Sequence, residues 1–202
     1  MAVDRTPIAK QSRREGYSLH PKAHKILVRR STPPGGKVGR GGKSQYSIQL
    51  REKQKVKRLY GLLERQFAKL MKEAQRKSGP TGELLLQFLE QRLDSAVYRA
   101  GFANSRRASR QLVTHGHFML NGRRVDIPSI RLMPGDKIIL RDSSKSNNYF
   151  KNLNDVSPAP SDIPSWLKVD RKTVKLEVTG VPNREEAEPD INEQLIVEYY
   201  SR

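Results

Sequence analysis

A group of side chains suited to binding phosphate lies between residues 106 and 117. Arg106, Arg107 and Arg110 carry planar guanidinium groups, and each can give a phosphate two charge-assisted hydrogen bonds. His115 and His117 flank a glycine and can donate to a phosphate or stack on a base. The chemistry that these residue types predict is the binding of a nucleic-acid backbone.

Catalytic and metal chemistry find weaker support. Gly42-Lys43-Ser44 is similar to the end of a phosphate-binding loop, but that loop needs a glycine at position 37, where Lys37 stands, and a buried strand before it. We therefore reject nucleotide hydrolysis. The chain has no cysteine, which excludes disulfides, Cys-bound zinc and thiol nucleophiles. His20 and His24 have no further ligands nearby, so they favour polar or phosphate contacts, and we predict no metal and no cofactor.

The charge of the 202-residue chain is strongly basic and unevenly distributed. The formal net charge is +18, and aromatic residues make up only 6%. Residues 1–77 hold 21 Lys/Arg and 5 Asp/Glu, a net of +16, whereas residues 78–202 have a net of +2. Residues 91–141 form a second basic region, with a net of +7. Two separate basic regions favour a long polyanion as the partner.

The first 77 residues predict a flexible segment followed by a long helix. Residues 1–47 combine several cations with Pro33-Pro34 and with five glycines between residues 32 and 44, so we expect an extended basic arm that becomes ordered on RNA. An unstructured solubilising tail is the alternative. Residues 47–77 repeat apolar side chains every three or four positions and place cations on the other positions, which predicts one amphipathic helix.

Helices and a hairpin should position the phosphate-binding side chains. We expect helices over residues 83–100, closed by Gly101, and 106–115, capped at Asn104-Ser105 and closed by Gly116. Asn121-Gly122 predicts a hairpin turn, because both residues tolerate positive φ. Arg123 and Arg124 follow that turn on opposite sides, so we expect only one of them to meet RNA.

The remaining residues predict a loop, two further strands and a short closing helix. Residues 137–141 and 172–179 have the pattern of strands, 142–165 that of a polar connection, and 193–201 that of a helix. No apolar run is long enough to cross a membrane, and residues 1–20 lack a secretory signal.

The pattern over residues 92–141 is specific. It includes Arg92-Leu-Asp94, Ser109-Arg-Gln-Leu-Val113, His115-Gly-His117, Asn121-Gly122 and Gly135-Asp136. It resembles the small RNA-binding module named after protein four of the small ribosomal subunit, which has two helices and a short β ribbon. The basic arm, Tyr60-Gly61 and the terminal Leu-Ile-Val-Glu-Tyr-Tyr-Ser extend the likeness, so that the whole chain resembles the bacterial-type small ribosomal subunit protein four (uS4) family.

The resemblance implies an α+β fold and a role in the ribosome. We expect a basic arm (1–47), a helical lobe (48–90 with 190–202) and an α+β lobe (91–189) that contains the RNA-binding module at about 92–153. Family members bind small-subunit rRNA early, at a multi-helix junction of its 5′ domain, and so nucleate assembly. They also contact neighbouring small-subunit proteins where mRNA enters and influence decoding accuracy, and mRNA there is a further partner that we consider. The expected location is the cytoplasm, in the ribosome. Many members bind zinc through N-terminal cysteines, which this chain lacks.

We expect mostly phosphate and 2′-hydroxyl contacts, with affinity that falls steeply with salt. The acidic residues 185–190 are either a surface for a protein neighbour or a solvated loop. The candidate RNA-binding residues are Arg13, Arg14, Arg29, Arg30, Lys37, Arg40, Lys43, Lys55, Arg58, Arg106, Arg107, Arg110, Gln111, His115, His117, Asn121 and Arg123.

Parts of the sequence also point to two alternative functions. Gln91-Arg92-Leu93-Asp94 is similar to the catalytic motif of RNA pseudouridine synthases, but no catalytic domain fits in this chain and Asp94 falls inside a helix of the module. We therefore expect no enzyme. A non-ribosomal RNA binder with the module on a basic tail is the second alternative, and it predicts weak, salt-labile association with ribosomes.

Overall fold

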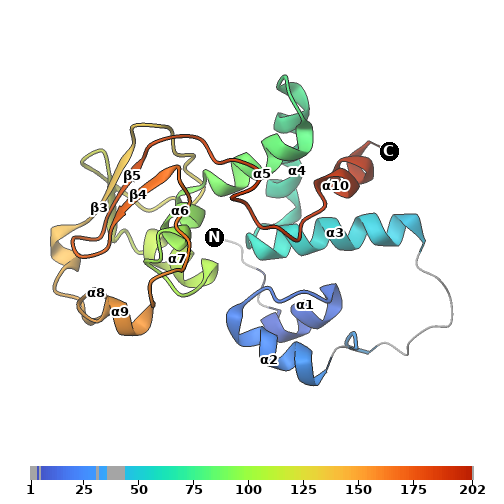
Figure 1. Ribbon diagram of the computed structural model, residues 1–202, viewed down its shortest axis with the longest axis horizontal. Coiled ribbons are helices and arrows are strands. Elements are labelled where there is room, and N and C mark those ends of the chain that lie inside the picture. Colours follow the sequence, from blue (N-terminus) through green and yellow to red (C-terminus); the bar gives the residue numbers. More distant parts are fainter. Residues whose placement is uncertain (1–3, 5, 31, 36–43, 202) are drawn as a thin grey trace. The chain divides into compact units, whose positions relative to one another are not determined.

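The protein is mixed α+β, as the sequence predicts, and divides into two compact units (Figure 1). The computed structural model describes residues 4, 6–30, 32–35 and 44–201. The first unit comprises residues 1–85 with 190–202 and is called the N-terminal unit. The second comprises residues 86–189 and is called the module unit.

Helices build the N-terminal unit. They are α1 (Ile8–Glu15), α2 (Pro21–Arg29), α3 (Gln45–Leu59), α4 (Glu64–Arg76) and α10 (Glu193–Tyr200), while α5 (Thr81–Glu90) leads into the module unit. α10 packs against α3 although it comes from the other end of the chain (Figure 1). Val56, Phe67, Met71 and Ile196 are fully buried and form part of the core, so residues from both ends of the sequence complete this unit.

The extended conformation expected for residues 1–47 is wrong for α1 and α2. Gly16 ends α1 in the left-handed conformation, and the His20 ring caps α2 by accepting from the backbone N–H of Lys22. The hydroxyl of Ser12, fully buried, accepts from the backbone N–H of Leu19. Local caps and this small buried contact therefore favour two short helices in a segment whose composition predicted none.

The single helix expected over residues 47–77 is two helices, separated by a tight turn. Tyr60 ends α3, Gly61 takes a φ of 63°, and the N–H of Leu62 bonds to the carbonyl of Lys57 at 2.9 Å. The N–H of Gly61 also bonds to the carbonyl of Arg58, which completes a Schellman turn. The apolar periodicity continues through this turn because Leu62 is buried as well.

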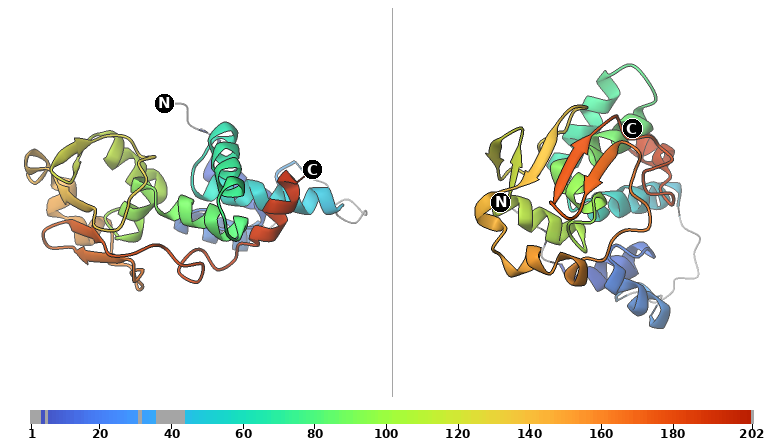
Figure 2. Two further views of the ribbon diagram at one scale, coloured as in Figure 1. Left: turned by 90° about the horizontal axis from the view of Figure 1, so that it is seen from above. Right: turned by 60° about the vertical axis from the view of Figure 1, so that its left-hand side comes forward.

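The module unit is a five-stranded antiparallel sheet with helices against one face (Figure 2). The strands are β1 (Phe118–Leu120), β2 (Arg123–Val125), β3 (Lys137–Leu140), β4 (Leu167–Asp170) and β5 (Lys175–Val178), in the order β2-β1-β3-β5-β4. The helices are α6 (Leu93–Arg99), α7 (Arg106–Thr114), η1 (Asp142–Ser144), α8 (Asn148–Lys151) and α9 (Leu153–Val156).

The register places one apolar row of the sheet beneath the helices. Leu120 pairs with Ile138, which pairs with Leu176, and the last two are fully buried. This row packs with Val97 of α6 and Val113 of α7 in one core. The sheet therefore fixes α7 through its buried side and leaves its other side exposed.

The helix expected over residues 83–100 is interrupted at Arg92. The backbone of Arg92 is extended and forms a β-bridge with Arg131. The flanking N–H groups of Leu93 and Leu132 bond to the carbonyls of Ile130 and Gln91, each at 2.9 Å. Pairing with a segment some forty residues away thus replaces helical hydrogen bonds and divides α5 from α6.

The polar connection expected over residues 142–165 contains three short helical segments, and the strand β4 that follows it was not expected. β5 begins at Lys175 rather than at residue 172, because Val174 has a φ of 51°. Among the described residues, no helix has both the length and the apolar character that crossing a membrane requires.

Candidate nucleic-acid interface

The exposed side of α7 carries a straight row of polar side chains. Ser105 caps the helix by accepting from the backbone N–H of Ala108 at 3.2 Å, and Leu112 and Val113 bury its other side. Arg107, Gln111 and His115 are all exposed and follow one another at intervals of four residues. Residues four apart share one helix face, so these three side chains form a row about 12 Å long. We call it the α7 row.

Arg106 lies in an intramolecular network rather than on open surface. Its Nη2 is 2.9 Å from Glu188 and 3.4 Å from Glu90, whose side chain is almost fully buried. Arg99 gives Glu90 two hydrogen bonds at 2.9 and 3.0 Å. The Arg106 guanidinium also lies 4.6 Å from the centre of the Tyr98 ring. The network joins α5, α6, α7 and the segment before α10, which gives Arg106 a structural role.

Arg110 is close to a second buried ion pair. Arg92 holds Asp94 through two hydrogen bonds at 3.0 and 2.8 Å, and Arg110 lies 3.8 Å from the same carboxylate. Burial lowers the pKa of Arg110, with Asp94 opposing this shift. Arginines therefore enclose the Asp94 carboxylate. The backbone carbonyl of Asp94 accepts a hydrogen bond from the Ser109 hydroxyl. This surrounding fits a structural carboxylate.

The two histidines have different surroundings. His115 is exposed, whereas His117 is half-buried, with its Nδ1 at 3.0 Å from the Ser144 hydroxyl and its ring against Phe150. Burial, with smaller contributions from His115 and Arg141, lowers the pKa of His117 below its ordinary value. His117 is therefore mainly neutral at pH 7, and it can offer a hydrogen bond or a ring face but no full charge.

The hairpin brings Arg124 next to the end of α7. Both turn residues have positive φ, 48° for Asn121 and 81° for Gly122. The Asn121 side chain is used within the fold: it donates to Asp136 at 2.8 Å and accepts from the backbone N–H of Lys137 at 2.9 Å. Arg123 and Arg124 are both exposed.

Arg124 covers Gly116, the residue that ends α7. A Cβ added to Gly116 would meet the Nε of Arg124 at 2.7 Å, so only glycine leaves room for the guanidinium there. Gly116 lies between His115 and His117, whose ring centres are 6.0 Å apart. Arg124 therefore extends the α7 row, and the list of candidate residues omitted it. The opposite-side rule for strands predicted that one of the two arginines meets RNA, and Arg123 was the one named.

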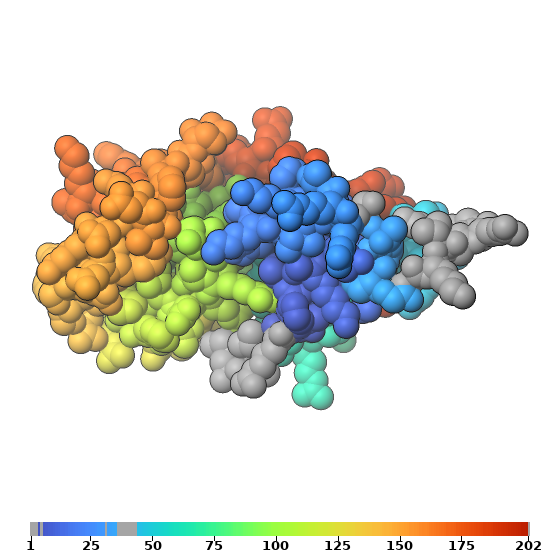
Figure 3. All heavy atoms as spheres, turned by 90° about the horizontal axis from the view of Figure 1, so that it is seen from below, coloured from blue at the N-terminus to red at the C-terminus, as the bar shows by residue number. Residues whose placement is uncertain are grey.

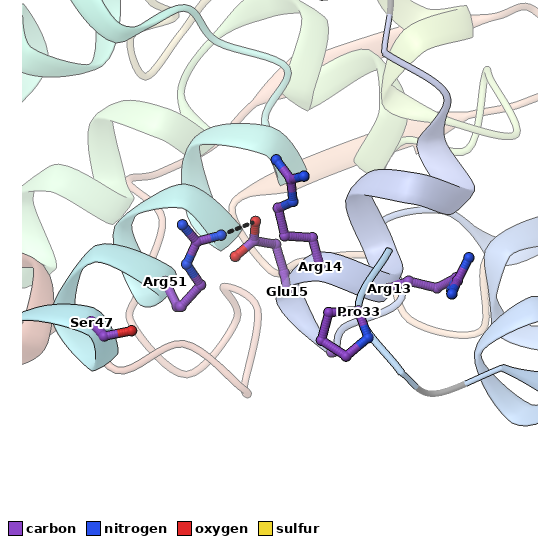
Figure 4. A pocket seen from close by; sticks show the side chains of 7 residues that line it. Arg13, Arg14, Glu15, Pro33, Ser47 and Arg51 are labelled. Carbon is purple, nitrogen blue, oxygen red and sulfur yellow. Dashed lines mark hydrogen bonds and ion pairs between the residues drawn. The ribbon is translucent and has the colours of Figure 1, made fainter. Parts of the chain in front are cut away.

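In the N-terminal unit, the C-terminal end of α1 packs against α3 around Glu15 (Figure 4). The Glu15 side chain is fully buried, and it accepts from Arg51 at 3.4 Å and from Arg58. Burial raises the pKa of Glu15, although Arg58 and Arg51 oppose this shift. Arg13 donates to the carbonyl of Thr32 at 3.0 Å and points away from Arg51 (Figure 4). Arg13 and Arg51 thus do not converge on one bound anion.

The other candidate residues of the N-terminal unit either make polar contacts within the fold or are exposed. Lys55 contacts Glu52 at 2.8 Å and the Asp190 carbonyl at 2.6 Å. Arg14 on α1, Arg29 on α2 and Arg30 directly after α2 are exposed, and the paired helices α1 and α2 present a broad surface (Figure 3). The candidates Lys37, Arg40 and Lys43 lie outside the described residues.

No group of three or more His, Cys, Asp or Glu side chains in the described part of the chain is arranged to hold a metal ion. Of the residues predicted to bind phosphate, the structure brings together Arg107, Gln111 and His115 on open surface and adds Arg124. It places Arg106, Arg110 and Arg58 in ion pairs within the fold. The arrangement offers donors and positive charge without a nucleophile or base held against a cavity.

These features define an RNA-binding protein of the S4-domain class. A family model described as "S4 domain" matches residues 91–138, and one described as "Ribosomal protein S4/S9 N-terminal domain" matches residues 4–90.

Curated relatives agree along the full length. "Small ribosomal subunit protein uS4" of Chloroflexus aurantiacus is 50% identical over 97% of both chains. Proteins of the same name from a Roseiflexus species and from Chlorobaculum tepidum are 47% and 48% identical over all of both chains. The chain therefore belongs to the uS4 family of small ribosomal subunit proteins, a structural and non-enzymatic family, and it is located in the ribosome. The family predicted from the sequence is thus confirmed.

Proposed function

We propose that this protein binds small-subunit rRNA directly and early, at a multi-helix junction of the 5′ domain, and thereby nucleates assembly of the subunit. The observation that carries the proposal is the α7 row with Arg124, a continuous exposed surface of donors on a helix that the core holds in place. Backbone recognition of this kind suits A-form RNA, which is bound mainly through its shape, phosphates and 2′-hydroxyls. The candidate residues Arg107, Gln111 and His115 would act there with Arg124. Arg14, Arg29 and Arg30 would add a second contact region.

The experiment measures binding of the full-length protein to a transcript of the rRNA 5′ domain. Arg107→Gln/Arg124→Gln removes two exposed cations and should weaken binding and lower the slope of log affinity against log salt by about 1–2, since each phosphate contact contributes about 0.7–0.9. Lys168→Gln/Lys172→Gln removes two exposed cations from β4 and the turn after it and serves as the matched control. Equal affinity of both variants and the wild type would contradict the proposed interface.

The second part of the proposal concerns the mature subunit in the cytoplasm. There the protein would contact neighbouring small-subunit proteins where mRNA enters, with mRNA within reach, and so affect decoding accuracy. In the acidic segment, Glu186 accepts from the backbone N–H of Ser165 at 2.8 Å and Glu188 contacts Arg106, so exposed Glu185 is the residue best placed for a protein neighbour. Glu185→Lys should raise misreading of a reporter codon in cells without reducing rRNA affinity. Unchanged misreading would argue against this contact.

A further inference from the structure

α4 carries a row of cations that the interface described above does not include. Arg65, Lys69, Lys72 and Arg76 are spaced by four, three and four residues, and all four are exposed. At 100° per residue they fall within about 60° of the helix circumference. They extend over about 16 Å of its length. We call them the α4 row.

The core lies on the opposite side of α4. Phe67, Met71 and Ala74 are completely buried and hold the helix against the rest of the N-terminal unit. The four cations line a shallow hollow together with Ala68 and Glu73. Ala68 is short, so the long cationic side chains stand around it and leave room for a chain of anionic groups between them.

Cations on the neighbouring helix α3 behave differently. Arg51 and Arg58 contact Glu15, Lys53 and Lys57 contact Glu64, and Lys55 contacts Glu52. Among the described residues, none of the four side chains of the α4 row makes a hydrogen bond or an ion pair. These five cations of α3 thus have carboxylate partners within the fold, whereas the cations of the α4 row are left for another molecule.

Helix stability does not account for this row. Cations near the C-terminal end of a helix are favoured by the helix dipole, which suits Lys72 and Arg76. Arg65 occupies the first turn, where the dipole disfavours a cation. A row that includes an unfavourable position fits binding better than it fits solubility alone.

We propose that the α4 row is a further rRNA-binding surface, which holds a sugar-phosphate backbone along the helix. A duplex or a single strand supplies a line of anions, and a line of four cations on one helix face complements it in shape and charge. This inference rests on the proposed function, because it assigns a further segment of the same rRNA to a site that lies wholly in the N-terminal unit.

The test compares four full-length proteins on the transcript of the rRNA 5′ domain, by affinity over a salt series and by hydroxyl-radical footprinting. They are the wild type, Arg65→Gln/Lys69→Gln/Lys72→Gln/Arg76→Gln, the charge-conserving Lys69→Arg/Lys72→Arg, and Arg107→Gln/Arg124→Gln. Glutamine is a good helix former, so α4 should persist in the first variant.

The Gln variant should lose about tenfold or more in affinity, and its salt slope should fall by about 3. It should lose protection at nucleotides that the Arg107→Gln/Arg124→Gln variant leaves protected. The Lys69→Arg/Lys72→Arg variant should keep the wild-type affinity and the wild-type footprint. Its melting temperature should stay unchanged or rise. If the Gln variant melts lower, the single variant Lys69→Gln, which removes no native contact, decides by its loss or retention of the same footprint.

Two outcomes overturn the inference and leave the proposed function intact. In one, the Gln variant binds and protects rRNA like the wild type while Arg107→Gln/Arg124→Gln is impaired. In the other, its rRNA binding is normal but subunits that contain it lose a neighbouring protein, which would make the surface a protein contact. A wild-type protein that fails to bind the transcript overturns the proposed function itself.

Discussion

Arg106 and Arg107 are neighbours on α7, but their surroundings give them different roles. Helical periodicity assigned both to the exposed side of the helix, and the structure adds acidic partners for Arg106 that lie 16 and 82 residues away in the sequence. Such partners cannot be identified from spacing along one helix. Arg107 has no comparable acidic neighbour among the described residues and stays on open surface.

This difference predicts opposite effects of two similar substitutions. Arg106→Gln should lower the free energy of unfolding by about 1–3 kcal/mol, because it leaves the buried Glu90 with fewer donors. Arg107→Gln should change stability by less than about 0.5 kcal/mol and weaken rRNA binding instead. Urea unfolding and rRNA affinity, measured on both variants, check the assignment. Equal destabilisation by the two substitutions would show that the network does not hold Arg106.

Glu64 provides a pH-dependent contact between α3, α4 and α10. Its carboxylate accepts from Lys53 at 2.6 Å, from Lys57 at 3.0 Å and from the Tyr200 hydroxyl at 2.9 Å. Burial alone would raise the pKa of Glu64, but these hydrogen bonds outweigh burial and lower it below 4.5. The folded state therefore favours the ionised carboxylate.

The stabilisation from Glu64 is consequently complete above pH 5 and disappears as the pH falls through the lowered pKa. Glu64→Gln should reduce the free energy of unfolding by up to about 1 kcal/mol at pH 7, a modest value because the side chain is half exposed. Below the lowered pKa the variant and the wild type should unfold alike. Glu83→Gln, at an exposed carboxylate of α5, is the control for the loss of one surface charge. A difference that persists undiminished at pH 2 would contradict the ionic origin.

At the scale of elements, the turn between α3 and α4 depends on one glycine. Gly61 has a φ of 63° and its N–H closes the end of α3. A side chain in this conformation costs about 1–2 kcal/mol, so Gly61→Ala should lower the melting temperature measurably. Gly61→Asn should cost less, because Asn adopts the left-handed region more readily. If both variants melt at the wild-type temperature, the turn does not depend on the positive φ of Gly61.

Local signals predicted the parts of the fold that local chemistry determines. Ser105 and Gly116 define α7, Asn121 and Gly122 define the hairpin, and residues 193–201 contain α10, as the sequence indicated. The break at Arg92 was not predictable in this way, because it results from pairing with Arg131. Likewise Arg124 joins the α7 row through its position over Gly116, which only the folded hairpin creates.

At the scale of the whole molecule, each of the two units contains a buried core of its own. Ile196 of α10 is fully buried in the N-terminal unit, and Leu176 of β5 is fully buried in the module unit. Trp166, the only tryptophan, is buried in the module core and reports on that unit alone.

Replacing either core residue by alanine should therefore affect different signals. Each substitution should cost about 2–5 kcal/mol in its own unit. Leu176→Ala should shift the unfolding transition seen by Trp166 fluorescence, whereas Ile196→Ala should shift helix loss seen by circular dichroism and leave the fluorescence transition in place. Coincident shifts of both signals in both variants would show that the chain unfolds as one cooperative body.

The packing of α10 against α3 also has a consequence for synthesis of the chain. The module unit is continuous in sequence and can fold as soon as residue 189 has left the exit tunnel. The N-terminal unit is made first but is completed last, since residues 190–202 must be translated before α3 meets its partner. Until then α3 lacks the cover of Ile196, Gln49 lacks its acceptor Glu198, and Lys53 lacks the Tyr199 and Tyr200 rings. The order of translation thus exposes this basic helix for most of the lifetime of the nascent protein.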